Sequence, residues 1–423
     1  MDHNHNRGCV NPGQGRSAGL PFRFAPLIRI MIAKPPRNRS QSPLGIAAIA
    51  TWSPAWILTN DWFESMPRKF VKHTGILERP VSQVDEVNLA GRAIDRLACN
   101  RGLNPDRCAA LVFTSPSLVP MPVARKFLDR RSVQREQMHR TARQVCRQSG
   151  LKPRKISATH TFCAGFAKAL SLVRYKIAPS ISLATDEYIL VVTSSRISRI
   201  TDYGCRDTAG LFGDLATVTL ICRPDHPDFP VHFDLIDAQV ERKPTRRALF
   251  DFEQRADVLT PIRNGGRRNE PQRIVFSMDG MGIADTAPRA MASAARSMAR
   301  RIGVNPEQVQ FIVPHQAGSA IVRLAEMKLR EAGFDGTVIN GLTRNVGNVS
   351  SGSIPYALDQ MWADLNGTIL CPIASVGPPG RPVVAQGCIA LRSTESHELA
   401  ARSAAARSRQ GVAGQVPASR CQH

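Results

Sequence analysis

The stretch Ile156-Ser-Ala-Thr-His-Thr-Phe-Cys-Ala-Gly-Phe-Ala-Lys-Ala-Leu-Ser-Leu-Val173 joins a strand-like segment to an apolar helix through a turn that carries Cys163. A thiol at the start of a helix faces unpaired backbone N–H groups and the positive end of the helix dipole, and both favour the thiolate. A thiolate can capture an acyl group as a thioester. The competing interpretation is a buried, inert cysteine, which is the commoner fate of a lone cysteine. Gly165 is predicted to permit a tight backbone turn beside the thiol.

Two later segments carry side chains that complement a thiol. His315 lies in Val313-Pro-His-Gln-Ala317, after a short apolar strand, where a neutral imidazole can donate or accept a hydrogen bond near a thioester carbonyl. Asn348 lies in Gly347-Asn-Val-Ser-Ser-Gly-Ser-Ile-Pro355, a loop predicted to open a helix, and its amide can support an oxyanion without adding a charge. Taken singly, a satisfied core histidine and an ordinary turn asparagine are the simpler interpretations.

Strand and helix signals alternate along the chain. Continuous apolar runs predict the strands, and apolar periodicity predicts the helices. This alternation indicates an α/β fold with a parallel or mixed sheet. A weak internal similarity, in which a strand, a reactive residue and a helix follow one another around Cys163 and again around His315, indicates two related halves. We expect strands at 44–50, 109–113, 188–192 and 310–313, and helices at 87–101, 164–176 and 288–302.

The composition excludes several classes of protein. The chain has 423 residues, 43% of them hydrophobic, which is enough for two ordinary domains or one large duplicated domain. No apolar run approaches the roughly 18 residues that a membrane-spanning helix needs. Ten cysteines form no CxxC pair and no metal-binding spacing, so we expect no disulfide framework, no metal and a reducing, cytoplasmic setting. Nucleotide hydrolysis and hydride transfer are not indicated, because neither a GxxxxGK[ST] loop nor a dinucleotide fingerprint occurs.

The chain is strongly basic, with a formal net charge of +22. A basic protein attracts nucleic acid, anionic lipid or an acidic carrier protein, and the competing interpretation is a solvated, arginine-rich surface. A nucleic-acid-binding function rests on charge alone, because the sequence lacks a zinc finger, a helix-turn-helix and an aromatic-interleaved basic strand. Residues 1–42, with seven Lys/Arg and one acid, are expected to form a disordered basic extension, and residues 395–423 a flexible tail.

In order and in flanking residues, the three chemical segments resemble the ketoacyl-acyl-carrier-protein synthase III family of thiolase-fold condensing enzymes. The resemblance implies a five-layer αβαβα fold made of two similar halves, residues 43–222 with the cysteine and residues 223–394 with the histidine and the asparagine. It also implies a homodimer. The resemblance runs from about Pro43 to about Arg392 and includes the segments Thr74-Gly-Ile-Leu-Glu-Arg79, Gly204-Cys-Arg-Asp-Thr208, Leu211-Phe-Gly-Asp214 and Met278-Asp-Gly280.

The same resemblance implies roles for individual residues. Cys163 would accept an acyl group from acyl-coenzyme A or a carrier thioester. His315 and Asn348 would stabilise the enolate that forms when a malonyl thioester loses carbon dioxide. The backbone N–H groups of Cys163 and Gly377 would form the first oxyanion hole, although two prolines, which have no N–H, follow Gly377 here. No cofactor beyond these thioester substrates is implied.

The predicted substrate-delivery residues depart from the family pattern. Lys69 and His73 stand where the family has a tryptophan and an arginine beside the adenine of coenzyme A, so base stacking would be lost while Lys69 still attracts phosphate. Arg206 matches the family's other adenine-side arginine. Gly318-Ser-Ala320 replaces a segment that normally ends in an arginine, which removes a cation that would pair with an acidic carrier protein.

Residues 122–155 differ most from the family and hold eleven Lys/Arg against two acids. Met138, Ala142 and Val145 form one helical stripe, so we predict a surface helix in this segment. Its basic face either docks an acidic carrier protein or is a solvated helix face.

The leading prediction is a decarboxylating Claisen condensing enzyme of fatty-acid initiation or secondary metabolism. One alternative is a thiolase-fold acyltransferase that forms an ester or amide without a carbon–carbon bond, and another is a non-catalytic partner subunit. Release of carbon dioxide from a malonyl thioester separates the first two. Retention of all three site residues disfavours the third, because such subunits often lose one of them.

Overall fold

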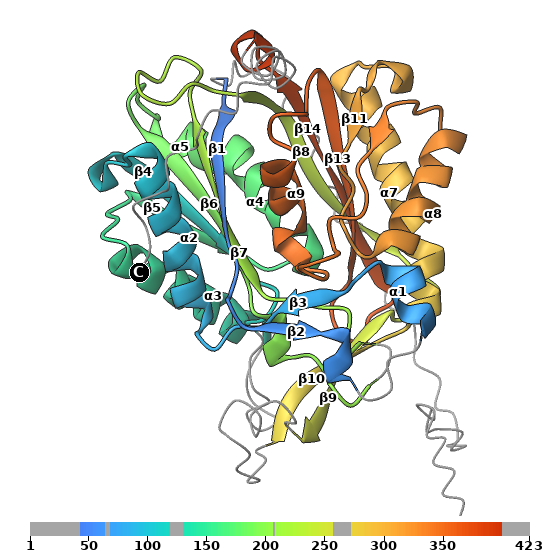
Figure 1. Cartoon of the computed structure of the whole chain (residues 1–423). Coiled ribbons are helices and arrows are strands. Elements are labelled where there is room, and N and C mark those ends of the chain that lie inside the picture. The colour runs from blue at the N-terminus through green and yellow to red at the C-terminus, as the bar shows by residue number, and fades with distance from the viewer. Residues whose placement is uncertain (1–42, 64–67, 119–129, 206–207, 257–271, 400–423) are drawn as a thin grey trace, which may run out of the picture. The chain divides into compact units, whose positions relative to one another are not determined.

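Two sets of five strands make up the main sheet. The computed structural model describes residues 43–63, 68–118, 130–205, 208–256 and 272–399, and within them ten strands run in the order β12-β11-β13-β14-β8-β1-β7-β6-β4-β5 (Figure 1). The first set is β1 (Gly45–Trp52), β4 (Cys108–Thr114), β5 (Lys155–Thr159), β6 (Tyr188–Ser195) and β7 (Leu215–Cys222). The second set is β8 (Phe233–Pro244), β11 (Phe311–Ile312), β12 (Thr337–Val338), β13 (Thr368–Val376) and β14 (Val383–Ser393).

The two sets have the same connectivity. Numbered within its own set, each lies in the order first, fifth, fourth, second, third across the sheet. In both sets the first–fifth and fifth–fourth pairs are antiparallel, and the remaining two pairs are parallel. The sets join at β1 and β8 through only two residue pairs, Gly45 with Asp234 and Ile46 with Phe233. This duplication confirms the prediction of two similar halves.

Helices cover both sets and fill the space between them. α2 (Glu86–Arg101) and α3 (Arg130–Gln148) pack on the first set, whereas α7 (Gly280–Ile302) and α8 (Ser319–Glu331) pack on the second. α4 (Gly165–Leu172) and α9 (Ser353–Gln360) lie between the sets (Figure 1). The sequence of α4 explains its central position, because most of its residues are apolar and buried and Lys168 is its one charged residue. The result is the predicted αβαβα layering.

Burial of the α4 side chains supplies much of the cohesion at the centre. Phe166 and Leu170 are fully buried and pack in one cluster with residues of β4, β6 and β8, which come from both sets. Complete burial of a side chain of this size contributes roughly 1.5–3 kcal/mol. The middle layer therefore ties the two halves together, although their strands share only a short junction.

Smaller elements surround the sheet. β2 (Ile57–Thr59) pairs with β3 (Glu78–Pro80), and β9 (Phe250–Ala256) pairs antiparallel with β10 (Gln272–Met278). α1 (Arg68–Thr74) packs against α8. α4 continues through one π-helical turn, Val173–Ile177, into α5 (Ala178–Ile181). None of the described helices combines the length and apolar character that crossing a bilayer requires.

The predicted strands and helices occur at closely similar positions, with two corrections. The helix predicted at 288–302 begins at Gly280, because the side chain of Asp279 caps it by accepting a hydrogen bond from the N–H of Gly282 (2.9 Å). The predicted tail needs correction at residues 395–399, which form a helical turn. His397 in that turn is buried, and its Nε2 lies 3.0 Å from the carbonyl oxygen of Leu365. Residues 1–42 and 400–423 lie outside the described residues.

Candidate active site

Cys163 is presented on a strained turn between β5 and α4. The 3-10 turn Phe162–Ala164 connects these elements, and Phe162 has a φ of 41°. A bulky residue rarely adopts this left-handed conformation, which persists only where the surrounding packing enforces it. The ring of Phe162 packs against those of His160 and Phe250 (centroids 4.5 and 4.9 Å away). These contacts fix the turn that holds the thiol.

Gly165 is needed for space and not for an unusual turn. Its φ is −57°, in the ordinary helical region, so the predicted role in a tight turn is wrong. A Cβ atom at this position would lie 2.4 Å from Oγ1 of Thr114 and 3.1 Å from Cβ of Ser351. Glycine therefore allows the start of α4 to pack closely against β4 and against the loop that follows Asn348.

The thiol of Cys163 is half-buried among apolar groups and receives a hydrogen bond. Burial raises the pKa of the Cys163 thiol above its ordinary value, and the neighbouring hydroxyls of Ser350 and Ser375 lower that pKa only in part. Oγ of Ser350 donates to Sγ at 3.4 Å. The predicted preference for the thiolate is therefore wrong, because loss of water around the sulfur outweighs the groups that favour its charge.

His315 is a buried, uncharged imidazole. It follows β11 and Pro314, its backbone N–H donates to the carbonyl of Pro372 (3.0 Å), and the residue is 3% exposed. Burial lowers the pKa of His315 to about 4, so the ring is neutral at pH 7. Nδ1 has no hydrogen-bond partner within the described residues. The ring therefore keeps hydrogen-bonding capacity for another molecule.

The carboxamide of Asn348 is held in one orientation by its own loop. Its Oδ1 accepts a hydrogen bond from the backbone N–H of Ser350 (2.9 Å), and its backbone N–H donates to the carbonyl of Leu211 (2.7 Å). The residue is 6% exposed. Because the amide oxygen is engaged, the NH₂ group is the part that remains to donate.

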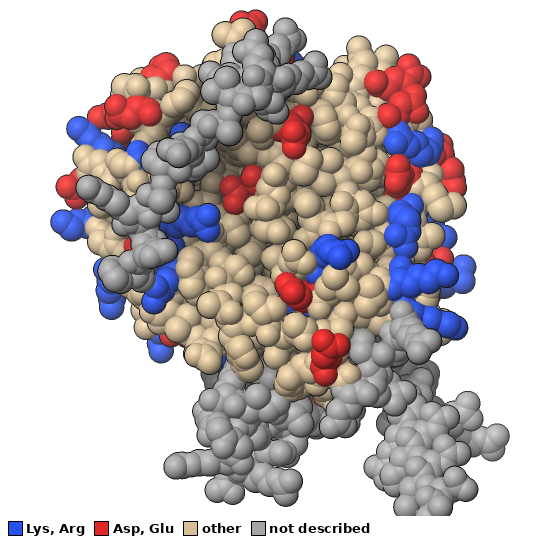
Figure 2. Space-filling model, in the orientation of Figure 1, with Lys and Arg blue, Asp and Glu red and all other residues tan. Residues whose placement is uncertain are grey.

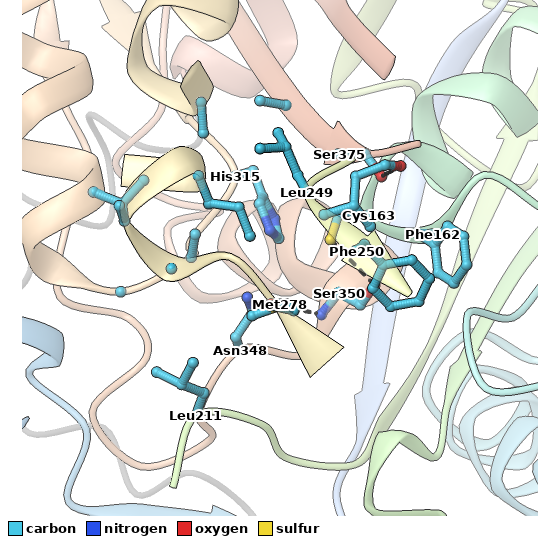
Figure 3. Close-up of a pocket in the computed structure, with 18 of the residues that line it drawn as sticks. Phe162, Cys163, Leu211, Leu249, Phe250, Met278, His315, Asn348, Ser350 and Ser375 are labelled. Carbon is cyan, nitrogen blue, oxygen red and sulfur yellow. Dashed lines mark hydrogen bonds between the residues drawn. The ribbon is translucent and has the colours of Figure 1, made fainter. Parts of the chain in front are cut away.

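Cys163, His315 and Asn348 all line one cavity of about 360 Å³. Figure 3 shows Cys163, Ser350 and Asn348 joined by hydrogen bonds, with His315 across the same space. The cysteine comes from the first half of the fold and the other two residues from the second. The structure thus brings together the three residues that were singled out from distant parts of the sequence.

The walls of the cavity are almost entirely apolar and come from elements that sequence reasoning did not connect with the site. The β9–β10 hairpin supplies Phe250, Phe276 and Met278, and α7 supplies Ala287 and Met291, among others. In the sequence, these residues are typical of the buried positions of ordinary strands and helices. The four further motifs quoted for the family resemblance nevertheless include five lining residues, Thr74, Leu211, Phe212, Met278 and Gly280.

The predicted substrate-binding residues have different positions. His73 on α1 lines the cavity and is exposed, whereas Lys69 on the same helix is exposed but does not line the described part of the cavity. Arg206 lies outside the described residues. Gly377 follows β13 and packs against Val383; it is not among the residues that line the described cavity, although the two residues before it are.

In the duplicated fold, the position in the second half that is equivalent to Cys163 is not His315, as the sequence similarity predicted. Cys163 follows β5, the third strand of its set, but His315 follows β11, the second strand of the other set. The third strand there is β12, after which a 3-10 turn leads into α9. Ser350 opens that turn with a φ of 49°, as Phe162 does in the first half, so the counterpart of Cys163 is Ser351.

Comparison with protein families gives two matches, one to a segment that includes Cys163 and one to a segment that includes His315 and Asn348. The model of 3-oxoacyl-[acyl-carrier-protein] synthase III matches residues 159–236, and the model of the C-terminal part of that protein matches residues 299–370. The beta-ketoacyl-[acyl-carrier-protein] synthase III of Clostridium beijerinckii is 26% identical over 337 residues, which cover 76% of this chain and 91% of that protein. The Neisseria gonorrhoeae protein of the same name is 29% identical over 197 residues, which cover 47% of this chain and 55% of that protein.

Solved structures show the same fold. A 3-oxoacyl-(acyl carrier protein) synthase III from Pseudomonas aeruginosa superposes with a TM-score of 0.61 at 20% identity, over 84% of this chain and 99% of that one. The priming beta-ketosynthase of the R1128 polyketide pathway gives a TM-score of 0.59 at 19% identity, over 84% and 98% of the two chains. The likeness therefore covers nearly the whole of each solved chain.

Proposed function

Because the chain belongs to the thiolase-fold family of 3-oxoacyl-[acyl-carrier-protein] synthase III-like proteins, we propose that it is a condensing enzyme that joins an acyl group to a malonyl thioester. The observation that carries this proposal is the cavity shared by a thiol, a neutral imidazole and an oriented carboxamide. Fatty-acid initiation and secondary metabolism are both settings for this reaction.

In the first half-reaction, the sulfur of Cys163 attacks the carbonyl carbon of an acyl thioester. A carbon–sulfur bond to Cys163 forms, the bond to the donor thiol breaks, and the donor thiol leaves with the proton that Cys163 gives up. The carbonyl oxygen is negatively charged on the way. We propose that the backbone N–H groups of Cys163 and Gly377 stabilise this oxyanion.

In the second half-reaction, a malonyl thioester loses carbon dioxide, and the electron pair of the broken carbon–carbon bond forms an enolate. The NH₂ group of Asn348 and the ring of His315 stabilise the enolate oxygen. The enolate carbon then attacks the acyl carbonyl on Cys163, and the electron pair of the carbon–sulfur bond returns to the sulfur. Both donors are uncharged, so they stabilise the charge mainly when it develops.

The apolar walls favour an apolar acyl group. Phe250, Phe276 and Met291 contribute only hydrocarbon, ring or thioether surface to the cavity, and a charged or hydroxylated group would lose its hydration there without compensation. Each methylene that such walls bury contributes about 0.8 kcal/mol. We therefore propose simple alkyl or alkenyl acyl groups as the substrates that Cys163 accepts.

Cations border the place where the cavity reaches the surface. His73 and Leu324 both line the cavity and are exposed, so the cavity opens between α1 and α8. Lys69, Lys72 and Arg323 on these two helices are exposed, and Lys and Arg side chains gather over α1 and the adjoining end of α8 at the right edge of Figure 2. We propose that this basic rim attracts the phosphates of coenzyme A or an acidic carrier protein.

The alternative docking surface is the predicted basic helix, which is α3. Met138, Ala142 and Val145 are buried as predicted, and Arg140, Arg143 and Arg147 are exposed. However, α3 packs on the first half, away from α1 and α8 in Figure 1, and none of its described residues lines the cavity.

Charge reversal at the two surfaces distinguishes them. Changing Lys69, Lys72 and Arg323 to Glu is expected to weaken binding of acyl-coenzyme A and acyl-carrier protein at least about tenfold at low salt, because several phosphate-facing cations are lost. The matched control changes Arg140, Arg143 and Arg147 to Glu, alters the net charge equally and should leave affinity unchanged. Affinity is measured by surface plasmon resonance, and a loss confined to the α3 variant would reverse the assignment.

We also propose a homodimer formed along β5. Within the described part of the chain β5 pairs only with β4, so its other side is an open sheet edge. Its residues from Ile156 to Thr159 are half-buried. The same strand leads directly to Cys163. Light scattering on the purified protein measures this state.

Exposure of the wild-type protein to a panel of acyl-coenzyme A thioesters tests the proposed function. Intact mass spectrometry is expected to show one added acyl group, mapped to Cys163, and malonyl thioester should then give carbon dioxide and a 3-oxoacyl product. An acyl adduct that yields an ester or amide without carbon dioxide would identify the acyltransferase alternative. Absence of any adduct would favour a non-catalytic subunit.

A further inference from the structure

Ser350 links two of the three site residues through separate parts of its own structure. Its backbone N–H donates to Oδ1 of Asn348 (2.9 Å), and its hydroxyl donates to Sγ of Cys163 (3.4 Å), across 187 positions of sequence. The residue is 3% exposed and lines the cavity. Figure 3 shows both hydrogen bonds from this one residue.

The backbone at Ser350 is held in a conformation that a residue other than glycine rarely adopts. Its φ of 49° lies in the left-handed region, and only a rigid environment keeps such a residue there. Ser350 is followed by Ser351, whose buried hydroxyl lies 3.3 Å from that of Ser195 and forms no hydrogen bond with the thiol. The strained turn therefore gives the two adjacent serines different partners.

Ser375 also lies beside Cys163, but its hydroxyl has two carbonyl acceptors besides the sulfur. Oγ of Ser375 donates to the carbonyl oxygen of Thr161 (3.1 Å) or to that of Val376 (3.3 Å). A hydroxyl has only one hydrogen to donate. The hydroxyl of Ser375 is thus shared among several acceptors, whereas the hydroxyl of Ser350 donates to the sulfur.

We propose that Ser350 is a further catalytic residue whose hydroxyl stabilises negative charge on the sulfur of Cys163. This proposal rests on the proposed function of Cys163 as the acyl-accepting nucleophile. In the loading step the hydroxyl favours the thiolate that attacks the donor thioester. In the condensation step the carbon–carbon bond forms, the carbon–sulfur bond breaks, and the returning electron pair on sulfur receives the same hydrogen bond. The hydroxyl keeps its proton throughout.

Alkylation of Cys163 by iodoacetamide at a series of pH values tests the proposal without any substrate. Peptide mass spectrometry follows Cys163 separately from exposed thiols such as Cys99. Ser350→Ala is expected to raise the midpoint of the pH profile by about one unit, and so to slow alkylation at pH 7 about tenfold, because the hydrogen bond to the charged sulfur is lost. Ser351→Ala, which loses a neighbouring buried hydroxyl, should leave the midpoint unchanged.

Two further measurements make the test decisive. Ser350→Gly removes the hydroxyl but accepts a positive φ without strain, so it should shift the midpoint as Ser350→Ala does even if the alanine variant folds poorly. Both variants keep the backbone N–H that holds Asn348, so malonyl thioester decarboxylation should persist while acylation slows. An unshifted midpoint in the Ser350 variants, or an equal shift in Ser351→Ala, would overturn the proposal. A shifted midpoint together with no condensation by the wild type would instead refute the proposed function.

Discussion

Cys163→Ala is expected to abolish formation of the acyl-enzyme and to lower the rate of condensation by roughly four to six orders of magnitude, as removal of a covalent nucleophile does. The variant should still decarboxylate malonyl thioester, because His315 and Asn348 come from the other half of the fold and keep their own supports. His315 is anchored through Pro372, and Asn348 through Leu211 and Ser350.

Intact mass spectrometry and a carbon dioxide assay measure the two activities separately. The control is Cys99→Ala, which removes an exposed thiol on α2 that does not line the cavity and should leave both activities unchanged. A covalent acyl adduct on the Cys163→Ala protein would contradict the assignment of the nucleophile.

Asn348→Ala and His315→Ala are expected to produce the reverse pattern. The acyl adduct on Cys163 should still form, whereas decarboxylation should fall roughly 10²–10³-fold for each variant, the usual cost of losing one oxyanion donor. Asn348→Asp provides a sharper comparison, because a carboxylate has the size of the amide but cannot donate and adds a negative charge beside the enolate. We therefore expect Asp to be at least as damaging as Ala at this position.

The same reasoning gives a pH dependence. Burial lowers the pKa of His315 to about 4, so the ring takes up a proton only as the pH falls through that value. Decarboxylation should therefore show no loss from His315 titration between pH 5 and 8, and should decline near pH 4 if the neutral ring is the active form. A decline centred near pH 6.5 that disappears in His315→Ala would contradict the assignment of a buried, neutral imidazole.

Much of the fold was predictable, because apolar runs and periodicity mark strands such as β4 and β6 and helices such as α2. The duplication was indicated only by a weak internal similarity of the sequence. The sequence similarity around Cys163 and His315 indicated the wrong pair, since equivalence of Cys163 with Ser351 depends on strand order in the sheet. The start of α7 was misplaced because a single capping side chain, Asp279, decides it.

The residues of the candidate site were likewise predictable only in part. Cys163, His315 and Asn348 stand out because their residue types and flanks carry the chemistry, and the structure places them around one cavity. Ser350 lies in the sequence segment that was singled out for Asn348. Its hydrogen bond to the thiol could not be predicted, because that contact depends on tertiary structure alone. The raised pKa of the thiol could not be predicted either. The position of Cys163 at the start of a helix can be inferred from the local sequence, but the apolar walls that bury the thiol come from the distant elements β9, β10 and α7.

The repeated strand order places the proposed nucleophile in one copy of the repeated unit and the proposed enolate-stabilising pair in the other. The apolar walls proposed to select the starter group come from the copy that also holds the amide and the imidazole, and the other copy supplies the sulfur. Substitutions on β9, β10 or α7 that alter starter preference therefore fall in the same copy as the amide and the imidazole. Each copy is therefore incomplete on its own, and the proposed reaction requires the middle layer that holds the two together.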